Sequence, residues 1–291
     1  MKEFKSGYVS IVGKPNAGKS SLMNELLGEK LAIVSPKAQT TRQRIIGILS
    51  EENYQIIFTD TPGILESKYK LQEKMLNEII AVRKETDVVL YVMDATDDLD
   101  ENIHALNFLK IKKPTIFLLN KIDKCKKTDL ELLQLKIIEL KIADILIPIS
   151  INANLNIDKI IPAIENLLPI APPFYDNETL TDKPIRFFVA ELVREKLFFL
   201  LDKELPYHAA VIVRSYEEKN TLTKVVADII VSRETQKQII IGKGGSMIQK
   251  IAEQSRADIE KFIDRKVFLE LKIKVRKNWR ENDLYLKEYG Y

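Results

Sequence analysis

Short apolar runs alternate with longer amphipathic segments over the first 170 residues of the chain. Five of these runs are rich in aliphatic and β-branched side chains: Tyr8–Val12, Tyr54–Thr59, Val88–Met93, Thr115–Leu119 and Ile145–Ile149. Continuous apolar runs of this length are typical of strands that are buried on both faces, and helix-length segments separate them. The pattern therefore predicts an α/β domain with a mostly parallel sheet and helices on both faces.

A stretch rich in proline and polar residues interrupts this pattern between residues 171 and 185. Its composition is typical of a linker, because proline cannot continue a helix or donate to a sheet. Beyond it, the pattern predicts a helix at Val189–Leu201, strands at Ala209–Val213 and Val225–Val231, two helical segments around a glycine loop, and a last strand at Val267–Val275. We therefore expect two domains, residues 1–170 and an α+β domain at 186–291, joined by a linker at 171–185.

The composition is that of a folded soluble protein, with 45% hydrophobic and 30% charged residues among 291. The net charge of +3 is too small to indicate nucleic-acid binding by itself, so such a function must follow from local clusters of basic residues. No apolar run approaches the length of a membrane-spanning helix. The single cysteine, Cys125, excludes an intrachain disulfide and fits a reducing cytoplasm.

The segment after the first predicted strand has the pattern of a phosphate-binding loop. It reads Gly13-Lys14-Pro15-Asn16-Ala17-Gly18-Lys19-Ser20, and a helix is predicted directly after it at Ser21–Leu27. Backbone N–H groups of such a loop point at phosphate oxygens, and the helix N-terminus adds a favourable potential. We expect Lys19 to bridge the β- and γ-phosphates and the Ser20 hydroxyl to bind Mg²⁺.

A second segment, after the strand Thr115–Leu119, indicates which base is bound. In Asn120-Lys121-Ile122-Asp123, the Asp123 carboxylate can accept from both N1–H and the 2-amino group of guanine. Adenine offers neither donor and would leave a buried carboxylate unpaired, so such a site rejects it by roughly 10⁴-fold or more. Asn120 supports the site and the Lys121 stem covers the base. Ser150-Ile151-Asn152, after the last strand of the domain, is expected to present backbone N–H groups to the guanine oxygen.

Two further segments are expected to respond to a γ-phosphate. Asp60-Thr61-Pro62-Gly63, followed by Ile64, closes a strand, so that Asp60 holds Mg²⁺ through water and the Gly63 N–H lies near the γ-phosphate. Gln39-Thr40-Thr41-Arg42 lies in the irregular stretch after the first helix, where a threonine hydroxyl reaches Mg²⁺ only while the γ-phosphate is present. We favour Thr41 over Thr40 for this contact, although spacing does not separate them. Release of both segments after hydrolysis is the expected switch.

The expected catalytic groups are Lys19, Thr41 and Gly63. No glutamine follows Gly63, where Ile64 stands, so the water-orienting side chain of Ras-type enzymes is missing. Unassisted turnover is therefore expected to be slow, on the order of 10⁻⁴ to 10⁻² s⁻¹. We hypothesise that Asn16 helps to hold a potassium ion that substitutes for an arginine.

The second predicted domain carries a Gly-x-x-Gly loop, Ile241-Gly242-Lys243-Gly244-Gly245. Glycines let a nucleic-acid backbone approach closely, and Lys243 adds positive charge. With the predicted order helix, strand, strand, helix, helix, strand, the loop predicts an RNA-binding KH domain of type II; a tight turn in another α+β module is the alternative. Lys272 and Lys274 alternate on the last strand and are predicted to contact phosphates from one solvent-exposed face.

Taken together, these motifs resemble those of the Era family of bacterial GTPases. The resemblance rests on Pro15-Asn16 in the phosphate loop, Lys37-Ala38-Gln39-Thr40-Thr41-Arg42, the Asp60–Gly63 and Asn120–Asp123 segments, Arg186–Lys196 and the Ile241–Gly245 loop. It covers essentially the whole chain. It implies a GTPase that binds the 3′ region of 16S ribosomal RNA, assists assembly of the 30S subunit, and is cytoplasmic and partly associated with the inner face of the membrane. Ile151 departs from the family, which usually has alanine there.

Two other functions are compatible with these residues. One is an RNA-binding scaffold that holds nucleotide without useful hydrolysis, and the other is a switch at a membrane surface whose basic C-terminal region meets anionic lipid. The aromatic residues Trp279, Tyr285 and Tyr289 either stack on bases or, as we favour, pack a terminal helix onto the domain. We expect the protein to be a monomer.

Overall fold

The computed structural model describes residues 3–35, 37, 39–64, 68–110 and 112–291, without the side chains of residues 82 and 83. The chain divides into two units, residues 1–67 with 74–182 and residues 183–291 with 68–73. The division after Asp182 falls inside the stretch that the sequence indicated as a linker. Ala38, part of the predicted switch segment, lies outside the described residues.

The first unit is built on a six-stranded sheet. In spatial order its strands are β2 (Ile45–Ser50), β3 (Tyr54–Asp60), β1 (Lys5–Val12), β4 (Val88–Asp94), β5 (Thr115–Asn120) and β6 (Ile145–Pro148). All neighbouring pairs are parallel except β2 with β3. The carboxyl ends of β1, β3, β4, β5 and β6 therefore meet at one edge of the sheet, which is where ligands bind in such folds.

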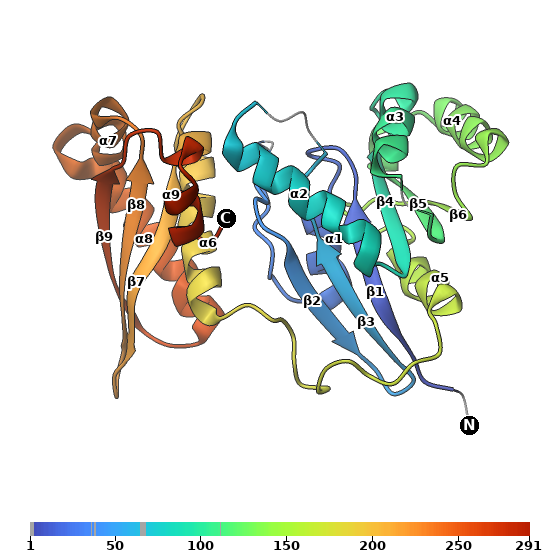
Figure 1. Cartoon of the computed structure of the whole chain (residues 1–291), viewed down its shortest axis with the longest axis horizontal. Helices are drawn as coiled ribbons and strands as arrows, with labels where there is room; N and C mark the ends of the chain where they lie inside the picture. Colours follow the sequence, from blue (N-terminus) through green and yellow to red (C-terminus); the bar gives the residue numbers. More distant parts are fainter. Residues whose placement is uncertain (1–2, 36, 38, 65–67, 111) are drawn as a thin grey trace. The chain divides into compact units, whose positions relative to one another are not determined.

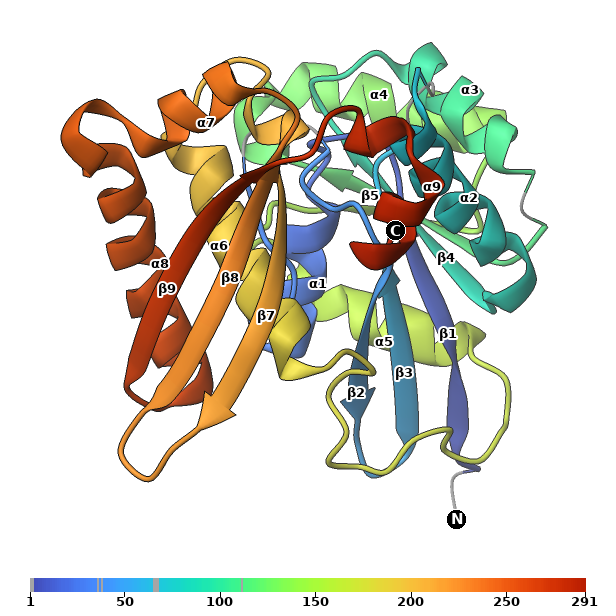
Figure 2. The ribbon, with the colours of Figure 1, turned by 60° about the vertical axis from the view of Figure 1, so that its left-hand side comes forward.

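Helices cover both faces of this sheet (Figures 1 and 2). They are α1 (Lys19–Leu27), α2 (Lys70–Glu85), α3 (Leu99–Leu109), α4 (Lys127–Leu140) and α5 (Ile160–Leu167). Ile79 of α2, Leu109 of α3 and Ile137 of α4 share one buried cluster with Tyr91 and Phe117 of the sheet. These contacts confirm the α/β architecture, because each helix buries one apolar stripe on strands that are themselves apolar throughout.

The antiparallel strand β2 was not predicted. Its residues, Ile45–Ser50, form an apolar run shortly after the predicted switch segment. β2 is joined to β3 by a tight hairpin and lies at the edge of the sheet. A long loop precedes it, so no crossover helix marks it as a strand in the sequence.

The predicted linker is fastened to the first unit along residues 169–180, which we call the strap. Its backbone pairs with β2 through the Ile48 N–H, which donates to the Leu180 carbonyl over 2.8 Å. The fully buried Gln55 side chain holds its centre: the carboxamide oxygen accepts from the N–H groups of Phe174 (2.7 Å) and Tyr175 (3.0 Å), and the amide donates to the Tyr175 carbonyl (2.8 Å). Most of the stretch that its proline content predicted to be a linker is thus anchored to the first unit, which the sequence did not indicate.

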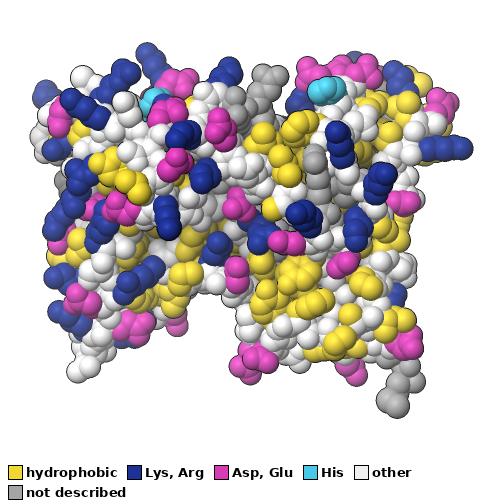
Figure 3. Space-filling view, in the orientation of Figure 1, with side chains coloured by type: hydrophobic (Ala, Val, Ile, Leu, Met, Phe, Trp, Pro, Cys, Tyr) yellow, Lys and Arg dark blue, Asp and Glu magenta, His cyan; other side chains and the backbone are white. Residues whose placement is uncertain are grey.

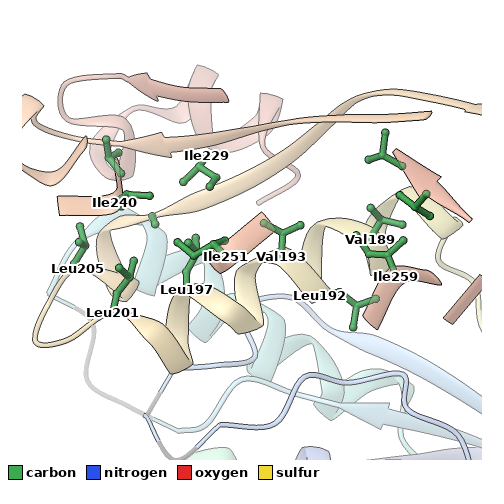
Figure 4. Close-up of a cluster of buried hydrophobic side chains, with 14 residues drawn as sticks. Val189, Leu192, Val193, Leu197, Leu201, Leu205, Ile229, Ile240, Ile251 and Ile259 are labelled. Atoms are coloured by element: carbon green, nitrogen blue, oxygen red, sulfur yellow. The ribbon is translucent and has the colours of Figure 1, made fainter. Parts of the chain in front are cut away.

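The second unit has the order α6 (Ile185–Leu200), β7 (Ala210–Glu218), β8 (Thr223–Val231), α7 (Glu234–Ile241), α8 (Ser246–Ile263) and β9 (Val267–Val275). β8 lies between β7, to which it is antiparallel, and β9, to which it is parallel. Figure 4 shows the core, in which Leu197 and Val193 of α6 meet Ile229 of β8 and Ile251 of α8. This is the predicted helix–strand–strand–helix–helix–strand arrangement of a type II KH domain.

The C-terminal residues pack onto this unit and end in the short helix α9 (Asp283–Glu288). Trp279 is fully buried and its Nε1–H donates to the His208 carbonyl over 3.1 Å, while Leu286 and Tyr289 are buried beside it. The aromatic residues therefore act in packing, as favoured from the sequence. No helix within the described residues is long and apolar enough to cross a membrane.

Candidate functional site

The phosphate loop lies where β1 ends and α1 begins. Gly13 has φ 149°, and a Cβ there would lie 2.2 Å from the Val92 carbonyl oxygen. Gly18 has φ 105°, and a Cβ there would lie 2.4 Å from the Asn120 amide nitrogen. Both positions thus require glycine for their backbone conformation and for the close approach of neighbouring strands. The loop that the spacing predicted is held at the carboxyl edge of the sheet.

Lys19, the predicted phosphate ligand, is buried and points back over the loop. Its ammonium group donates to the Lys14 carbonyl oxygen over 2.8 Å. Burial lowers the pKa of Lys19 to about 8, and the nearby Asp60 carboxylate opposes that shift. Lys14 itself turns outward and pairs with Glu101 of α3 over 2.5 Å. A desolvated ammonium next to inward-facing backbone N–H groups suits a phosphate chain, whose oxygens favour the charged form.

Three predicted magnesium ligands converge beside Lys19. The Ser20 Oγ lies 2.6 Å from Asp60 Oδ2 and 2.8 Å from Thr41 Oγ1, and the Thr41 hydroxyl donates to the same carboxylate over 3.2 Å. Thr40 turns away, since its hydroxyl donates to the Lys37 carbonyl (2.7 Å) and lies 2.7 Å from Ser35 Oγ. The structure thus separates the two threonines, which spacing could not do, and brings Thr41 to the site.

The chemistry of these groups fits Mg²⁺, which prefers hard oxygen donors. Asp60 is fully buried, and its second oxygen, Oδ1, has no hydrogen-bond partner among the described residues. Burial raises the pKa of Asp60, against the opposing effects of Ser20, Lys19 and Thr41. A buried carboxylate with an unpaired oxygen is costly unless a cation compensates it.

The segment after β3 packs directly on the phosphate loop. The Ile64 N–H donates to the Gly13 carbonyl over 3.1 Å, and a Cβ at Gly63 would lie 2.8 Å from the Cα of Pro15. The Thr61 hydroxyl donates to the Ile11 carbonyl over 2.9 Å, and Pro62 is buried. The Ile64 side chain packs into the core of the first unit. The backbone around Gly63, and no side chain of residue 64, therefore faces the phosphate position.

The base-binding residues form one hydrogen-bonded cluster. Asp123 Oδ1 accepts from the Ser150 hydroxyl over 2.5 Å. The Asn120 amide donates to the Ala17 carbonyl over 2.8 Å, and its oxygen accepts from the N–H groups of Lys121 (2.8 Å) and Ile151 (3.3 Å). Asn120 therefore joins the phosphate loop to the two base loops. The Ile122 side chain packs on the core, and its N–H donates to the Ile149 carbonyl over 3.3 Å.

Isoleucine at position 151 is accommodated in the loop after β6. The Ser150 hydroxyl oxygen accepts from the Ala153 N–H over 3.1 Å, so the turn keeps its hydrogen bonds. Ile151 and Asn152 both line the cavity between the loops, which has a volume of about 470 Å³. The cavity is also lined by Pro15, Asn16, Lys19 and Lys121. A nucleotide-sized space is thus bounded by the predicted residues.

Several residues at this site were missed by sequence reasoning. Ile33, Val34 and Ser35 line the cavity from the loop after α1, and Lys124 lines it beside the base loop. Asp94, at the end of β4, pairs with Lys121. The signal available for Asp94 was its position: a polar residue directly after a buried strand, at the edge where the other motifs meet.

The Gly-x-x-Gly loop joins α7 to α8 in the second unit. Gly242, Gly244 and Gly245 have φ values of 72°, 61° and 85°. A Cβ at Gly242 would lie 2.7 Å from Met247 Cβ, whereas a Cβ at Gly244 or Gly245 would meet no described atom within 4 Å. Ile241 ends α7, and the Lys243 side chain is exposed. The backbone of this loop is therefore accessible at Gly244 and Gly245, and the Lys243 ammonium group is exposed to solvent.

Lys272 and Lys274 do not lie beside that loop. They alternate with the core-facing Leu271 and Ile273, so they project from the face of the sheet opposite to the helices. Lys272 pairs with Glu270 over 3.1 Å, and Lys274 pairs with the buried Asp228 over 2.9 Å. The predicted common face is observed, but both ammonium groups already have carboxylate partners.

Comparison with known proteins gives two family matches within the chain. A model described as 50S ribosome-binding GTPase matches residues 8–121, and a KH domain model matches residues 204–280. GTPase Era of Geotalea uraniireducens is 41% identical over 294 residues, covering 100% of this chain and 99% of the relative. GTPase Era of Lacticaseibacillus paracasei is 41% identical over 298 residues, covering 100% and 98%.

Two solved structures match over nearly the full length. A crystal structure of Era in complex with MgGDPNP and nucleotides 1506–1542 of 16S ribosomal RNA has a TM-score of 0.93 and 39% identity, covering 99% of both chains. A variant of Aquifex aeolicus Era bound to GDP·AlF4⁻ has a TM-score of 0.93 and 38% identity over the same shares. Full-length identity, both domains and the nucleotide-site geometry lead to one conclusion: the chain belongs to the Era family of GTPases.

Proposed function

We propose that this GTPase is a switch that binds the 3′ region of 16S ribosomal RNA and assists assembly of the 30S ribosomal subunit. The observation that carries the proposal is the open Gly-x-x-Gly loop, where no described atom comes within 4 Å of a Cβ built at Gly244 or Gly245. Such a loop admits an RNA backbone and clamps about four nucleotides. The RNA held by the 39% identical relative supports the choice of target.

Charge supports RNA as the ligand of the second unit. Residues 183–291 hold 22 Lys and Arg against 16 Asp and Glu, a net charge of +6, whereas residues 1–182 hold 23 against 26, a net charge of −3. Figure 3 shows dark blue Lys and Arg side chains spread over the face formed by β7, β8 and β9. The mild overall charge of +3 hides this asymmetry. A basic domain attracts a polyanion over distances of about one Debye length.

GTP hydrolysis is carried out by groups that the first unit holds in place. Lys19 and the loop N–H groups would bind the phosphate oxygens, and Gly63 would present its N–H at the γ-phosphate. Ser20, Thr41 and Asp60 would hold Mg²⁺, which neutralises charge that develops on the phosphates. Because Ile64 faces the core, this chain supplies no side chain there to orient the attacking water. We therefore propose that unassisted turnover is slow.

The proposed GTP-dependent switch consists of two loops that reach the phosphate and magnesium site. Thr41 reaches it from the loop before β2, and Gly63 reaches it from the loop after β3. Loss of the γ-phosphate would remove a ligand that favours both positions, so both loops would be released. Release would free the Ile64 N–H from Gly13 and Thr41 from Asp60.

A potassium ion at Asn16 is part of the proposal. Asn16 has φ 63° and lines the cavity, and its carbonyl accepts from Lys121 over 2.8 Å, so its backbone is held beside the expected phosphate position. A cation there would replace the positive charge that an arginine supplies elsewhere. Initial rates of hydrolysis should be higher in potassium than in sodium at matched ionic strength. Equal rates would remove the potassium ion from the account.

We also propose that the protein acts as a monomer in the cytoplasm, in part on the inner face of the membrane. Binding to ribosomal RNA supports the cytoplasmic location. The basic second unit can bind anionic lipid headgroups as well as RNA, which supports the location at the membrane. Sedimentation of the purified chain tests the monomer. Competition between anionic vesicles and RNA tests which ligand the basic surface prefers.

The experiment that tests the RNA proposal measures affinity for a 37-nucleotide RNA equivalent to 16S nucleotides 1506–1542, against a shuffled RNA of the same composition. The variant Lys243→Asp with Gly244→Asp should lose binding while GTP affinity stays unchanged. Aspartate at the φ of 61° of Gly244 carries some backbone strain, but Asp264 adopts a similar φ of 50° and the space at Gly244 is open, so the fold should persist.

Lys266→Asp is the charge control, because it reverses a lysine at a strongly exposed site directly before β9 and changes the net charge by −2, against −3 in the loop variant. It should weaken RNA binding only slightly. Equal affinity for the two RNAs, or full binding by the loop variant, would show that the proposed target or the proposed loop is wrong.

A further inference from the structure

A carboxylate outside every nucleotide-binding motif joins the loops of the nucleotide site. Asp94 is the last residue of β4, between the strands that carry the phosphate loop and the base loop. Its Oδ2 accepts from the Lys121 ammonium over 2.6 Å. Its Oδ1 accepts from the Thr96 N–H over 3.0 Å and from the Thr96 hydroxyl over 2.8 Å. Both oxygens are used, so the orientation of the carboxylate is fixed.

The same ammonium reaches the phosphate loop. Lys121 Nζ donates to the Asn16 carbonyl over 2.8 Å as well as to Asp94. The Lys121 and Asp94 side chains are 22% and 13% exposed, so water screens this pair only in part. One side chain thus ties together β4, the phosphate loop and the base loop. Its aliphatic stem is the part expected to cover the guanine ring.

The charge state of Asp94 suits this role. Burial alone would raise the pKa of its carboxyl, but hydrogen bonds from Lys121 and Thr96 outweigh burial and hold that pKa below its usual range. Asp94 is therefore a carboxylate throughout the neutral range. A neighbouring acid is Asp97, whose pKa is raised by burial, with Lys14 and Lys121 opposing.

We propose that Asp94 is a positioning residue for nucleotide binding. It fixes the Lys121 ammonium, and through it the Lys121 stem and the Asn16 backbone, before the nucleotide arrives. A site arranged in advance loses less conformational entropy on binding and releases its ligand more slowly. The inference rests on guanine-nucleotide binding by the first unit and is independent of the RNA target.

The decisive variant is Asp94→Asn, which keeps the shape but replaces one acceptor oxygen with a donor. Either Lys121 or Thr96 then loses its acceptor, and the pair with Lys121 loses its charge. Stopped-flow measurement with ribose-labelled fluorescent GDP and GTP on the full chain should show release of both nucleotides accelerated about tenfold. Affinity for the 37-nucleotide RNA should stay within about twofold of the wild type, because Asp94 lies in the first unit.

A double-mutant cycle with Lys121→Met separates positioning from a general structural effect. Methionine keeps an aliphatic stem over the base but has no ammonium. If Asp94 acts through that ammonium, Asp94→Asn should not accelerate release further in the Lys121→Met background, because the two changes remove one interaction. Asp144→Asn, the same substitution at an exposed carboxylate that binds the Thr115 N–H, should leave release unchanged.

Two results would overturn the proposal. The first is unchanged nucleotide release both from Asp94→Asn and from Asp94→Asn with Asp97→Asn. The double variant is included because Asp97 could pair with Lys121 in place of Asp94, and unchanged release from both variants would show that this pairing does not position the site. Equal acceleration with and without the Lys121 ammonium would show that Asp94 acts on the fold and not through Lys121. A failure of the chain to bind the RNA would not contradict this proposal, because the proposal concerns nucleotide binding alone.

Discussion

Among single residues, the functional side chains that could be predicted from the sequence are those that lie inside or next to a recognisable motif. Asp123, Lys19 and Asp60 were predicted from the sequence because each directly follows or lies within a loop that ends a buried strand. Asp94 has the same kind of position, but its partner Lys121 is 27 residues away along the chain, and only the fold brings the two together. Likewise, spacing left Thr40 and Thr41 equivalent until their hydrogen-bond partners were known.

Replacing Asp123 with asparagine should change the base preference. The Asp123 carboxylate accepts from Ser150 and is expected to accept from guanine N1–H and N2–H. An asparagine amide donates instead, which suits the 2-oxo group of xanthine. Competition binding should show GTP affinity lower by at least ~10²-fold and XTP affinity raised. Unchanged GTP affinity in this variant would count against the assigned base contact.

Nucleotide affinity should also fall in mildly alkaline solution. Burial lowers the pKa of Lys19 to about 8, and phosphate oxygens favour the protonated ammonium. Above that pH, binding must include uptake of a proton, so GTP affinity should fall by up to about tenfold per pH unit and be nearly constant below pH ~7. Titration calorimetry between pH 7 and 9 in two buffers of different ionisation enthalpy measures both effects. Constant affinity to pH 9 without proton uptake would contradict the assigned state of Lys19.

At the scale of elements, the apolar runs located five strands of the first unit because such strands are buried on both faces. Strand β2 and the anchoring of the strap were not predicted, because both depend on tertiary contacts. β2 is an edge strand recognised by its pairing with β3, and the strap is held by the buried carboxamide of Gln55. The outward face of β9 was placed correctly from alternation, but the acids that pair with Lys272 and Lys274 come partly from a neighbouring strand.

Replacing Gln55 with leucine should loosen the strap. Leucine has similar volume but leaves two strap N–H groups and one carbonyl without their partner, a cost of about 2 kcal/mol or more for this fully buried side chain. Hydrogen exchange of the Phe174 and Tyr175 amides should accelerate at least ~30-fold. Gln249→Leu, at an exposed helix position, is the control and should change strap exchange little. Protection of both amides in the Gln55 variant would show that other contacts hold the strap.

At the scale of the whole molecule, two units of opposite net charge are carried on one chain, one built for a nucleotide and one with an open loop for RNA. Sequence motifs predicted both functions, because each depends on a short loop between regular elements. The overall net charge of +3 hides this division until the charges of the two units are counted separately. The anchored strap ends at Leu180, two residues before the boundary after Asp182.

A GTP-driven switch on ribosomal RNA can be tested by crosslinking the full chain to small-subunit ribosomal RNA in the GTP and GDP states and sequencing the bound RNA. We expect crosslinks concentrated at the 3′ end of 16S RNA, dependent on the Gly242–Gly245 loop and stronger with GTP than with GDP. Crosslinks that are scattered along the RNA, or that are the same in both nucleotide states, would contradict a GTP-driven switch with that target.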